Sequence, residues 1–466
     1  MDTGVALIAY ADRFGGSLAA LERLLDGPLA GVFGGVHVLP FYVPYDGADA
    51  GFDPEDHLSV DPRLGGWDDI RRLARAFDVT ADVIVNHLSD RSPAFRDVVA
   101  LGDHSPSSGM FLTFDAVFPA GAREADLVRI TRPRPGLPFT PVVLGGRRRL
   151  VWTTFTPHQI DLDARNPAVR AHLLAVLRRL ADNGVATVRL DAVGYAVKTK
   201  GTSCFLTPDT LAFVADVTAQ ARGLGLSVLA EVHAPSRREA AAAAIVDHVY
   251  DFTLAPAILR AVSTGDGGPL REWLGVRPPN TVTVLDTHDG IGLVDAAGLL
   301  AAGQIDALVE TISRNSAGTS RVSTTPDGSA YQVSCTAYDA LGRDDRRYLL
   351  ARLLHLFVPG IPHVYYVGLL AGRNAVGVTG DAREINRRSY TEAAVLTALR
   401  RPVVRRLSRM IRLRTTHPAF RGTFAATDRP GGELVLAWQA GPARAQLRAR
   451  LDDGWFRVTH TRHERR

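Results

Sequence analysis

The sequence predicts an α/β protein built as a (β/α)8 TIM barrel, with inserted loop domains after strands three and seven and a small C-terminal β domain. Three observations predict this fold class: eight short apolar runs, amphipathic stretches between them, and carboxylates that follow three of the runs. Buried parallel strands have nearly continuous apolar sequences, unlike half-solvated antiparallel strands. The expected strands lie at residues 5–10, 35–39, 82–86, 187–193, 227–232, 248–252, 281–286 and 363–367.

The segments between these runs predict crossover helices. Residues 68–76, 168–181 and 209–222 are amphipathic and long enough to connect parallel strands. Eight strands that alternate with helices favour a closed barrel over an open doubly wound sheet, and no GxGxxG or Walker pattern follows a strand to argue otherwise. Active sites of such barrels lie at the C-terminal ends of the strands.

Two long segments interrupt the alternation, one after the third strand and one after the seventh. Loops of this length are uncommon in compact domains unless they are functional, and on this fold they overhang the active-site face. The expected divisions are barrel at 1–88, an inserted domain at 89–166, barrel at 167–290, a second insertion with an acceptor and phosphate loop at 291–342, barrel at 343–419, and a C-terminal β domain at 420–466.

Composition excludes several classes of protein. The 466 residues are 46% hydrophobic and 22% charged, as in a globular protein with a sizeable core. The net charge is +5, but the basic runs are too short for a nucleic-acid footprint. No stretch approaches the ~18 apolar residues of a membrane span, and no signal peptide is readable. Because Cys204 and Cys335 indicate no disulfide framework, we expect a cytoplasmic protein. The short basic runs and the lack of a membrane span predict no nucleic-acid and no membrane partner.

Three acids, Asp191, Glu231 and Asp289, follow apolar runs and are expected to meet at one end of the barrel, as in enzymes that act on glycosidic bonds. Arg189 shares a strand face with Asp191, and a neighbouring Arg lowers a carboxyl pKa, which keeps a nucleophile ionised. Glu231 follows the apolar run SVLA, where desolvation raises a carboxyl pKa and suits a general acid. His288 and Asp289 together would hold sugar hydroxyls and stabilise an oxocarbenium-like charge.

Each of these residues also has a structural interpretation. Arg189 and Asp191 could form an ion pair inside the barrel, and Glu231 could be a buried carboxylate satisfied by backbone donors. Asp289 could cap a helix over GIGLVDA. His87 could be a core histidine, although it ends the third expected strand.

Other chemistries have little support. The histidines are scattered, without the HxH pattern or clustered ligands of a two-metal hydrolase barrel, and no G-x-S-x-G elbow is present. Neither cysteine lies in a nucleophile motif. We therefore expect no metal and no organic cofactor. Two carboxyls about 5–5.5 Å apart would predict retention of configuration through a covalent glycosyl-enzyme.

The motifs VIVNH, VRLDAVGY, LAEVH and VLDTHDG resemble, in order, the four strand-end regions of the α-amylase superfamily. Further motifs resemble the sucrose phosphorylase family: IAYADRFG, HVLPFYVPYDGADAGFDPEDH, RPRPGLPFT, GTSCFLTP, VPGIPHVYYVG and INRRSY. The resemblance covers nearly all of the chain before residue 420. It implies glucosyl transfer without a cofactor, with sucrose or a related α-glucoside and inorganic phosphate as partners, in a homodimer.

The resemblance also implies residue roles. Asp191 resembles the family's nucleophile, Glu231 its general acid/base and Asp289 its transition-state stabiliser. The residues implied to bind substrate are Asp49, Phe52, His87, Phe155, Gln159, Arg189, Tyr195, His233, His288 and Arg387. Those implied to bind phosphate or acceptor are Arg134, Tyr331 and Gln332. A planar Arg fork suits phosphate, and aromatic rings pack against apolar sugar faces.

One segment departs from the family pattern. Sucrose phosphorylases carry a Leu-Asp pair shortly before the tyrosine that matches Tyr331, where this chain has Gly328 and Ser329. The resemblance implies phosphorolysis of sucrose to α-glucose 1-phosphate and fructose through a covalent β-glucosyl-enzyme. The alternatives are phosphorolysis of sucrose 6-phosphate, glucosylglycerate or glucosylglycerol, an amylase-like hydrolase or transglucosidase, and a non-catalytic sugar-binding relative.

Overall fold

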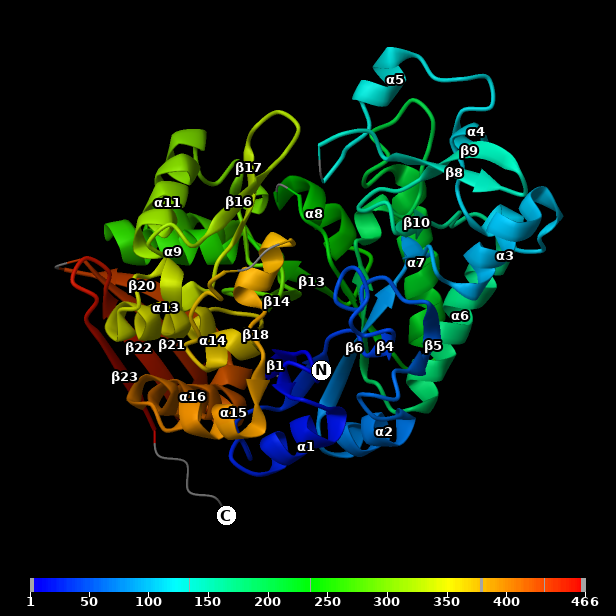
Figure 1. Cartoon of the computed structure of the whole chain (residues 1–466). Coiled ribbons are helices and arrows are strands. Elements are labelled where there is room, and N and C mark those ends of the chain that lie inside the picture. The colour runs from blue at the N-terminus through cyan, green and yellow to red at the C-terminus, as the bar shows by residue number, and fades with distance from the viewer. Residues whose placement is uncertain (1–3, 134, 235, 378–379, 431, 462–466) are drawn as a thin grey trace.

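Eight parallel strands close into a barrel in the order β1-β18-β14-β13-β12-β11-β6-β3 (Figure 1). The structure, a computed structural model, describes residues 4–133, 135–234, 236–377, 380–430 and 432–461. The barrel strands are β1 (Ala6–Ala9), β3 (Gly35–Val38), β6 (Asp78–Ile84), β11 (Thr187–Asp191), β12 (Ser227–Ala230), β13 (His248–Asp251), β14 (Thr281–Thr283) and β18 (Ile361–Tyr365). The predicted (β/α)8 barrel is confirmed, and every strand overlaps its predicted run.

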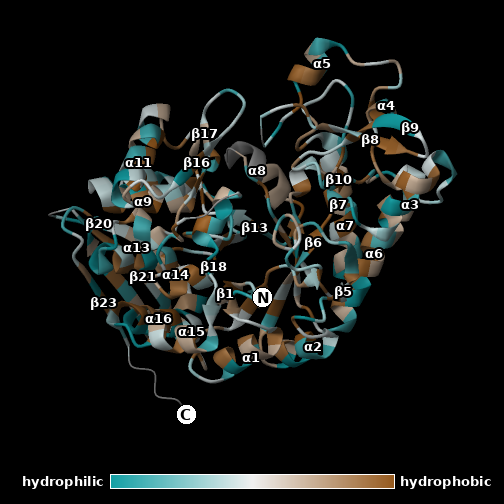
Figure 2. Cartoon of the chain, in the orientation of Figure 1, coloured by the Kyte–Doolittle hydropathy of each residue, from teal (hydrophilic) through white to brown (hydrophobic). Residues whose placement is uncertain are grey.

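Burial on both faces explains why these strands have apolar sequences. All five residues of β11 are buried, as are all four of β1 and of β3. Charged side chains enter the interior in pairs: Arg189 on β11 lies in register with Asp82 on β6. Helices cover the barrel, and in Figure 2 they carry both hydrophilic and hydrophobic residues, as amphipathic helices do.

The helices begin where capping residues stand in the sequence. Asn166 accepts a hydrogen bond from the backbone N–H of Ala168 and Pro167 occupies the first turn of α6, both typical of helix starts. The covering helices are α1 (Leu18–Asp26), α2 (Trp67–Ala76), α6 (Pro167–Asp182), α7 (Pro208–Gly223), α8 (Ser236–Ala243), α9 (Leu254–Thr264), α10 (Gly268–Val276), α13 (Asp345–Phe357), α14 (Tyr366–Leu369), α15 (Glu392–Leu399) and α16 (Pro402–Thr416).

The first excursion lies between β6 and α6. It contains β7 (His87–Ser89), α3 (Pro93–Leu101), α4 (Phe114–Val117), α5 (Glu124–Val128), the antiparallel pair β8 (Phe139–Leu144) and β9 (Arg147–Trp152), and β10 (Gln159–Asp161), which pairs with β7. A separate small core, which includes Phe118 and Trp152, lies within it. This excursion therefore has hydrophobic contacts of its own.

The second excursion follows β14 and rises on the same, upper side of the barrel in Figure 1. It contains β15 (Ile291–Gly292), a 3-10 turn η4 (Val294–Ala296), α11 (Ala302–Asn315), β16 (Arg321–Thr324), β17 (Ala330–Ser334) and α12 (Ala337–Ala340). Strand β15 directly follows Gly290, so the alternative that Asp289 caps a helix is wrong. The insertions predicted after the third and seventh strands are confirmed.

The chain ends in a four-stranded antiparallel sheet, which confirms the predicted small C-terminal β domain. Its strands are β20 (Thr423–Arg429), β21 (Glu433–Ala440), β22 (Ala443–Arg450) and β23 (Phe456–His460). Trp438 joins it to α13 by donating a hydrogen bond of 2.6 Å from Nε1 to the carbonyl of Phe357. Across the described parts of the chain, no helix has the length and apolar character needed to cross a bilayer.

Candidate active site

A cavity of about 580 Å³ opens at the C-terminal ends of the barrel strands, walled by both excursions. Its described lining includes the predicted residues Asp49, Phe52, His87, Phe155, Gln159, Asp191, Tyr195, Glu231, His233, His288, Asp289, Tyr331 and Gln332. Arg189 and Arg387 lie directly behind these side chains. The structure thus brings together acids that are far apart in the sequence.

Arg189 bonds to both Asp191 and Glu231. Its Nη1 lies 3.0 Å from Asp191 Oδ1, and its Nη2 lies 2.7 Å from Glu231 Oε2. The same guanidinium contacts Asp82, which is fully buried and also bonds to His37 at 3.0 Å. The Arg189–Asp191 ion pair of the structural interpretation therefore exists, but the guanidinium also reaches Glu231, so one fixed cation orients both acids.

The pKa directions of the two acids are the reverse of the sequence-based expectation. Burial and the charge of Glu231 outweigh Arg189 and raise the pKa of Asp191. Burial also acts to raise the pKa of Glu231, but Arg189 and His233 outweigh it and hold that pKa below its ordinary value. The difference arises because His233 faces Glu231, with Nε2 3.6 Å from Oε1. In the substrate-free site, Asp191 is therefore the weaker acid of the two.

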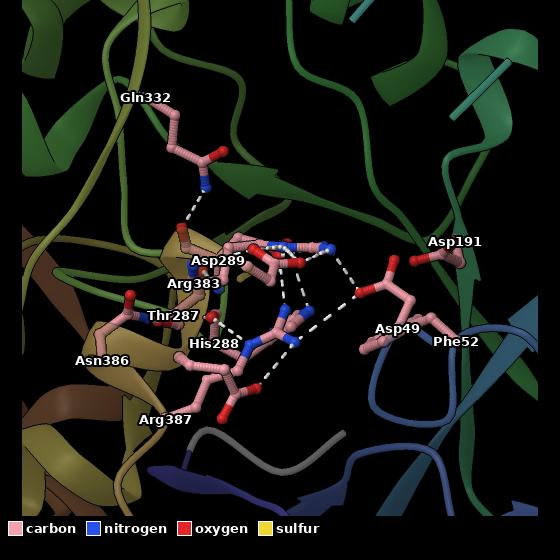
Figure 3. Close-up of polar contacts among 12 residues, drawn as sticks. Asp49, Phe52, Asp191, Thr287, His288, Asp289, Gln332, Arg383, Asn386 and Arg387 are labelled. Atoms are coloured by element: carbon pink, nitrogen blue, oxygen red, sulfur yellow. Dashed lines mark hydrogen bonds and ion pairs between the residues drawn. The ribbon is translucent and has the colours of Figure 1, made fainter. Parts of the chain in front are cut away.

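Asp289 follows β14 in a tight turn that two arginines surround (Figure 3). Its Oδ1 lies 3.2 Å from Arg387 Nη2 and 3.3 Å from Arg383 Nη1. Burial would raise the pKa of Asp289, but its neighbours, among them Arg383 and Arg387, hold it well below the ordinary value. The turn requires Gly290, because a Cβ there would overlap the carbonyl of Val333. Asp289 is therefore a fixed, ionised carboxylate.

Asp49 lies beside the same arginines. Arg383 Nη2 lies 2.5 Å from Asp49 Oδ1, and Gln159 donates from Nε2 to Oδ2 at 3.2 Å. Burial acts to raise the pKa of Asp49, but Arg383 and Arg387 lower it. His87 lies close by, with Nε2 2.8 Å from the carbonyl of Phe52. Carboxylate, amide and imidazole groups thus form a polar corner that suits hydroxyl groups.

Aromatic rings form the remaining wall of this part of the cavity. Phe52 stacks on His288 with centroids 4.8 Å apart and planes 7° apart. Phe155 meets His87 and Tyr195 edge-on, at 5.6 and 5.4 Å. Burial lowers the pKa of His288 to about 4, so its ring is neutral at pH 7. Polar groups on one side of the cavity and aromatic rings on the other complement the hydroxyl groups and the apolar face of a pyranose.

The opposite end of the cavity carries the residues predicted for acceptor and phosphate. The rings of His233 and Tyr331 lie 5.9 Å apart. Gln332 donates from Nε2 to the carbonyl of Asp289 at 2.5 Å (Figure 3). Pro133 lines the cavity, whereas Arg134, predicted to bind phosphate, lies outside the described residues. His233 therefore meets Glu231 on this side, and Tyr331 and Gln332 also line the cavity.

The hairpin between β16 and β17 carries the departure from the family pattern. Asp327 is held within the turn, where its Oδ1 accepts from the backbone N–H of Ser329 at 3.1 Å. Gly328 has a φ of +87°, which glycine adopts readily. Asp327, Gly328 and Ser329 are exposed and do not line the cavity, while Ser323 and Tyr331, on the strands next to the turn, do. The strand residues of the hairpin therefore contact the cavity, and the turn residues do not.

Charged residues in contact with the site that escaped sequence reasoning include Arg383, Asp381, Asp295 and Asp82. Arg383 lies in the 3-10 turn η5 (Ala382–Asn386), four residues before Arg387, so the INRRSY motif was the nearest signal. Asp295 bonds to His233, and Asp82 begins the run that ends in His87. Among the described residues, no group of three or more His, Cys, Asp or Glu side chains is placed to hold a metal ion.

Comparison with known proteins agrees with the geometry. Residues 32–222 match the family model described as "Alpha amylase, catalytic domain". A crystal structure of sucrose 6F-phosphate phosphorylase from Thermoanaerobacter thermosaccharolyticum superposes with a TM-score of 0.94, at 35% identity, and covers 99% of this chain and 96% of that chain. Fold and site thus define a barrel protein of the α-amylase type.

Full-length relatives narrow this class. A sucrose phosphorylase of Agrobacterium vitis is 49% identical over 98% of this chain and 97% of its own length. A sucrose phosphorylase of Bifidobacterium adolescentis is 44% identical over 96% of this chain and 92% of its own length. The chain belongs to the sucrose phosphorylase family.

Proposed function

We propose that the protein is a retaining glucosyltransferase that phosphorolyses sucrose to α-D-glucose 1-phosphate and fructose. The observation that carries this proposal is the meeting of Asp191, Glu231 and Asp289 in one cavity, with Arg189 bonded to the first two. Its full-length similarity to sucrose phosphorylases adds the acceptor, inorganic phosphate. The three acids argue against a non-catalytic sugar-binding role.

In the first step, Asp191 attacks C1 of the glucosyl unit while Glu231 protonates the departing fructose oxygen. This requires the proton to be on Glu231, although Asp191 is the weaker acid in the substrate-free site. A bound glucoside supplies the bias, because the leaving oxygen accepts a hydrogen bond from protonated Glu231 and the positive charge developing at C1 favours ionised Asp191. Asp289 and neutral His288 hold the ring hydroxyls, and Phe52 packs against the ring.

In the second step, phosphate attacks C1 of the β-glucosyl-enzyme. The C1–Asp191 bond breaks, a new C1–O bond forms on the opposite face, and Glu231 takes the proton of the attacking oxygen. Arg134, Tyr331 and Gln332 guide the phosphate, which must outcompete water by position and charge. Two inversions at C1 give retention of configuration.

Similarity favours sucrose, because the sucrose phosphorylases of Agrobacterium vitis and Bifidobacterium adolescentis are 49% and 44% identical to this chain. Relatives named as glucosylglycerol, sucrose 6(F)-phosphate and glucosylglycerate phosphorylases are 37%, 37% and 34% identical. Phosphorolysis of glucosylglycerol, sucrose 6-phosphate or glucosylglycerate therefore stays an alternative.

The test is an assay of sucrose cleavage with and without inorganic phosphate, with glucose 1-phosphate and free glucose as readouts. Phosphate-dependent glucose 1-phosphate is expected. Free glucose at an equal rate without phosphate would instead identify a hydrolase. Turnover of sucrose 6-phosphate, glucosylglycerate or glucosylglycerol but not of sucrose would overturn the substrate assignment.

We also propose the cytoplasm as the location and a homodimer as the assembly. Both described cysteines, Cys204 and Cys335, are buried and free, which suits a reducing compartment. The dimer follows from similarity to the family alone, and light scattering on the purified protein tests it. The six divisions of the chain are likewise proposals, which limited proteolysis at residues 88–89 and 419–420 would examine.

A further inference from the structure

A buried carboxylate fixes the ring of His233 at the acceptor end of the cavity. Nδ1 of His233 lies 3.0 Å from Asp295 Oδ2, and Asp295 Oδ1 accepts from the backbone N–H of Ala234 at 2.9 Å. The ring stacks on Phe252 with centroids 4.0 Å apart and planes 17° apart. These contacts leave Nε2 directed at Glu231 Oε1, 3.6 Å away.

The groups that face this ring favour its charged form. Carboxylates lie on both edges, Asp295 at Nδ1 and Glu231 at Nε2. Phe252 stacks on one face of the ring, and the ring of Tyr331 lies beside it, tilted by 59°. Burial acts to lower the pKa of His233, but Asp295 and Glu231 raise it to about 10. Asp295 is itself 1% exposed, so its charge is poorly screened by water. His233 is therefore an imidazolium at neutral pH.

The cavity needs such a cation if its acceptor is an anion. Its described acids are Asp49, Asp191, Glu231, Asp289 and Asp381, and its described cations are Arg383 and His233. Arg383 is bonded to three of the acids, Asp49, Asp289 and Asp381. Of these two cations, His233 is therefore the one that can meet an anion arriving beside Glu231.

We propose that Asp295 is a positioning residue for the acceptor step, because it holds His233 as a cation aimed at an anionic acceptor beside Glu231. The inference rests on the proposed function, with inorganic phosphate as the acceptor. As the C1–Asp191 bond breaks and the phosphate oxygen bonds to C1, the phosphate proton passes to Glu231. His233 keeps its own proton and moves the Nε2–H hydrogen bond from Glu231 to the phosphate.

The test is Asp295→Asn in the full chain, which keeps the size of the side chain and removes its charge. We expect the KM for phosphate to rise about tenfold or more, as the loss of a charge-assisted hydrogen bond predicts, with little change in the KM for sucrose. The alkaline limb of kcat/KM for sucrose should move to higher pH, because a neutral His233 no longer lowers the pKa of Glu231.

The matched control is Asp339→Asn, which neutralises another fully buried carboxylate, bonded to Arg343 outside the cavity. It should lower stability without changing the ratio of the two KM values. Equal effects of both variants on phosphate and sucrose would show a structural role for Asp295 and overturn the inference.

Calorimetric titration with inorganic phosphate alone separates this inference from the proposed function. Wild-type protein should bind phosphate at least about tenfold more tightly than Asp295→Asn, the same factor as the expected rise in the KM for phosphate. Equal binding overturns the inference even if wild type phosphorolyses sucrose. Conversely, weaker binding by the variant supports it even if wild type releases no glucose 1-phosphate from sucrose, in which case only the proposed function fails.

Discussion

Arg383 and Asp49 form an ion pair across the cavity, with Nη2 2.5 Å from Oδ1. Arg383 is also bonded to Asp381, which lines the cavity as well, and its Nη1 reaches Asp289 at 3.3 Å. It therefore neutralises two of the carboxylates that the family resemblance assigns to the glucosyl ring. A cation in this position controls the charge of the sugar-binding end.

We predict that Arg383→Ala raises the KM for sucrose about tenfold, because Asp49 loses its shortest ion pair and its pKa rises. Steady-state kinetics measure the change. Arg388→Ala is the control, since Arg388 lies in the same segment but its side chain is exposed. If both variants keep the wild-type KM, the Arg383–Asp49 pair has no part in sugar binding.

The roles of Asp191 and Glu231 predict that variants of these two residues form opposite anomers of glucosyl azide when azide is added. Glu231→Gln should lower kcat/KM for sucrose by about 10²–10⁴-fold, the usual contribution of a general acid, but much less for α-glucosyl fluoride, whose leaving group needs no proton. With azide, this variant should form α-glucosyl azide from the covalent intermediate. Asp191→Gly should instead form the β anomer by direct displacement.

The anomers are distinguished by the proton coupling at C1 in NMR spectra. The same anomer from both variants would show that the two roles are wrongly assigned. Asp191→Asn without azide should be inactive toward sucrose, and turnover above background would remove Asp191 from the role of nucleophile.

Much of the fold can be predicted because its signals are local. Strand β1, with the sequence ALIA, is buried on both faces, and β12, with the sequence SVLA, is buried over its last three residues, so both sequences are mostly apolar. Asp191 and Glu231 stand at or just after the strand ends, where this fold places its site. The boundaries are less predictable: residues 284–286 read as strand, but β14 ends at Thr283, where ladder pairing with β18 stops.

The rest of the site depends on contacts between distant segments. Arg383 bonds to Asp289, 94 residues before it, and Asp295 bonds to His233, 62 residues before it. Nothing in their local sequence distinguishes them from surface charges. The predicted order of the pKa values of Asp191 and Glu231 was wrong for the same reason. The order depends on the bond between Arg189 and Glu231 and on the orientation of His233.

The charge of His233 predicts a pH-dependent stability. Its pKa is raised to about 10 in the folded protein and is about 6.5 when unfolded. The folded state therefore binds this proton more tightly, so the stabilisation is complete below pH 6.5 or so and is lost as the pH rises through about 10. The loss should amount to a few kcal/mol at most.

Urea unfolding at pH 6 and pH 10 measures this effect as a difference between wild type and His233→Gln. The two proteins should differ less at pH 10 than at pH 6. His104→Gln, which removes an exposed histidine, should show a constant difference from wild type. A gap between wild type and His233→Gln that widens with pH would contradict the assigned charge.

Lys198 joins the barrel to the first excursion through a buried ammonium group. Its Nζ donates to Asn86 Oδ1 at 2.8 Å and to the carbonyl of Tyr195, and lies 2.7 Å from Asp161 Oδ2. Lys198 is 3% exposed and Asp161 0%. We predict that Lys198→Met destabilises the protein by about 3–5 kcal/mol, because the charge of Asp161 is left buried without its partner.

The double variant Lys198→Met with Asp161→Asn should recover part of this loss, because it also removes the stranded charge. Lys200→Met is the matched control: the chain contains one other lysine, Lys200, which is exposed, so its loss should have little effect. Urea midpoints for the four proteins measure the outcome. If Lys198→Met and Lys200→Met unfold at the same urea concentration, the ammonium group does not hold the excursion to the barrel.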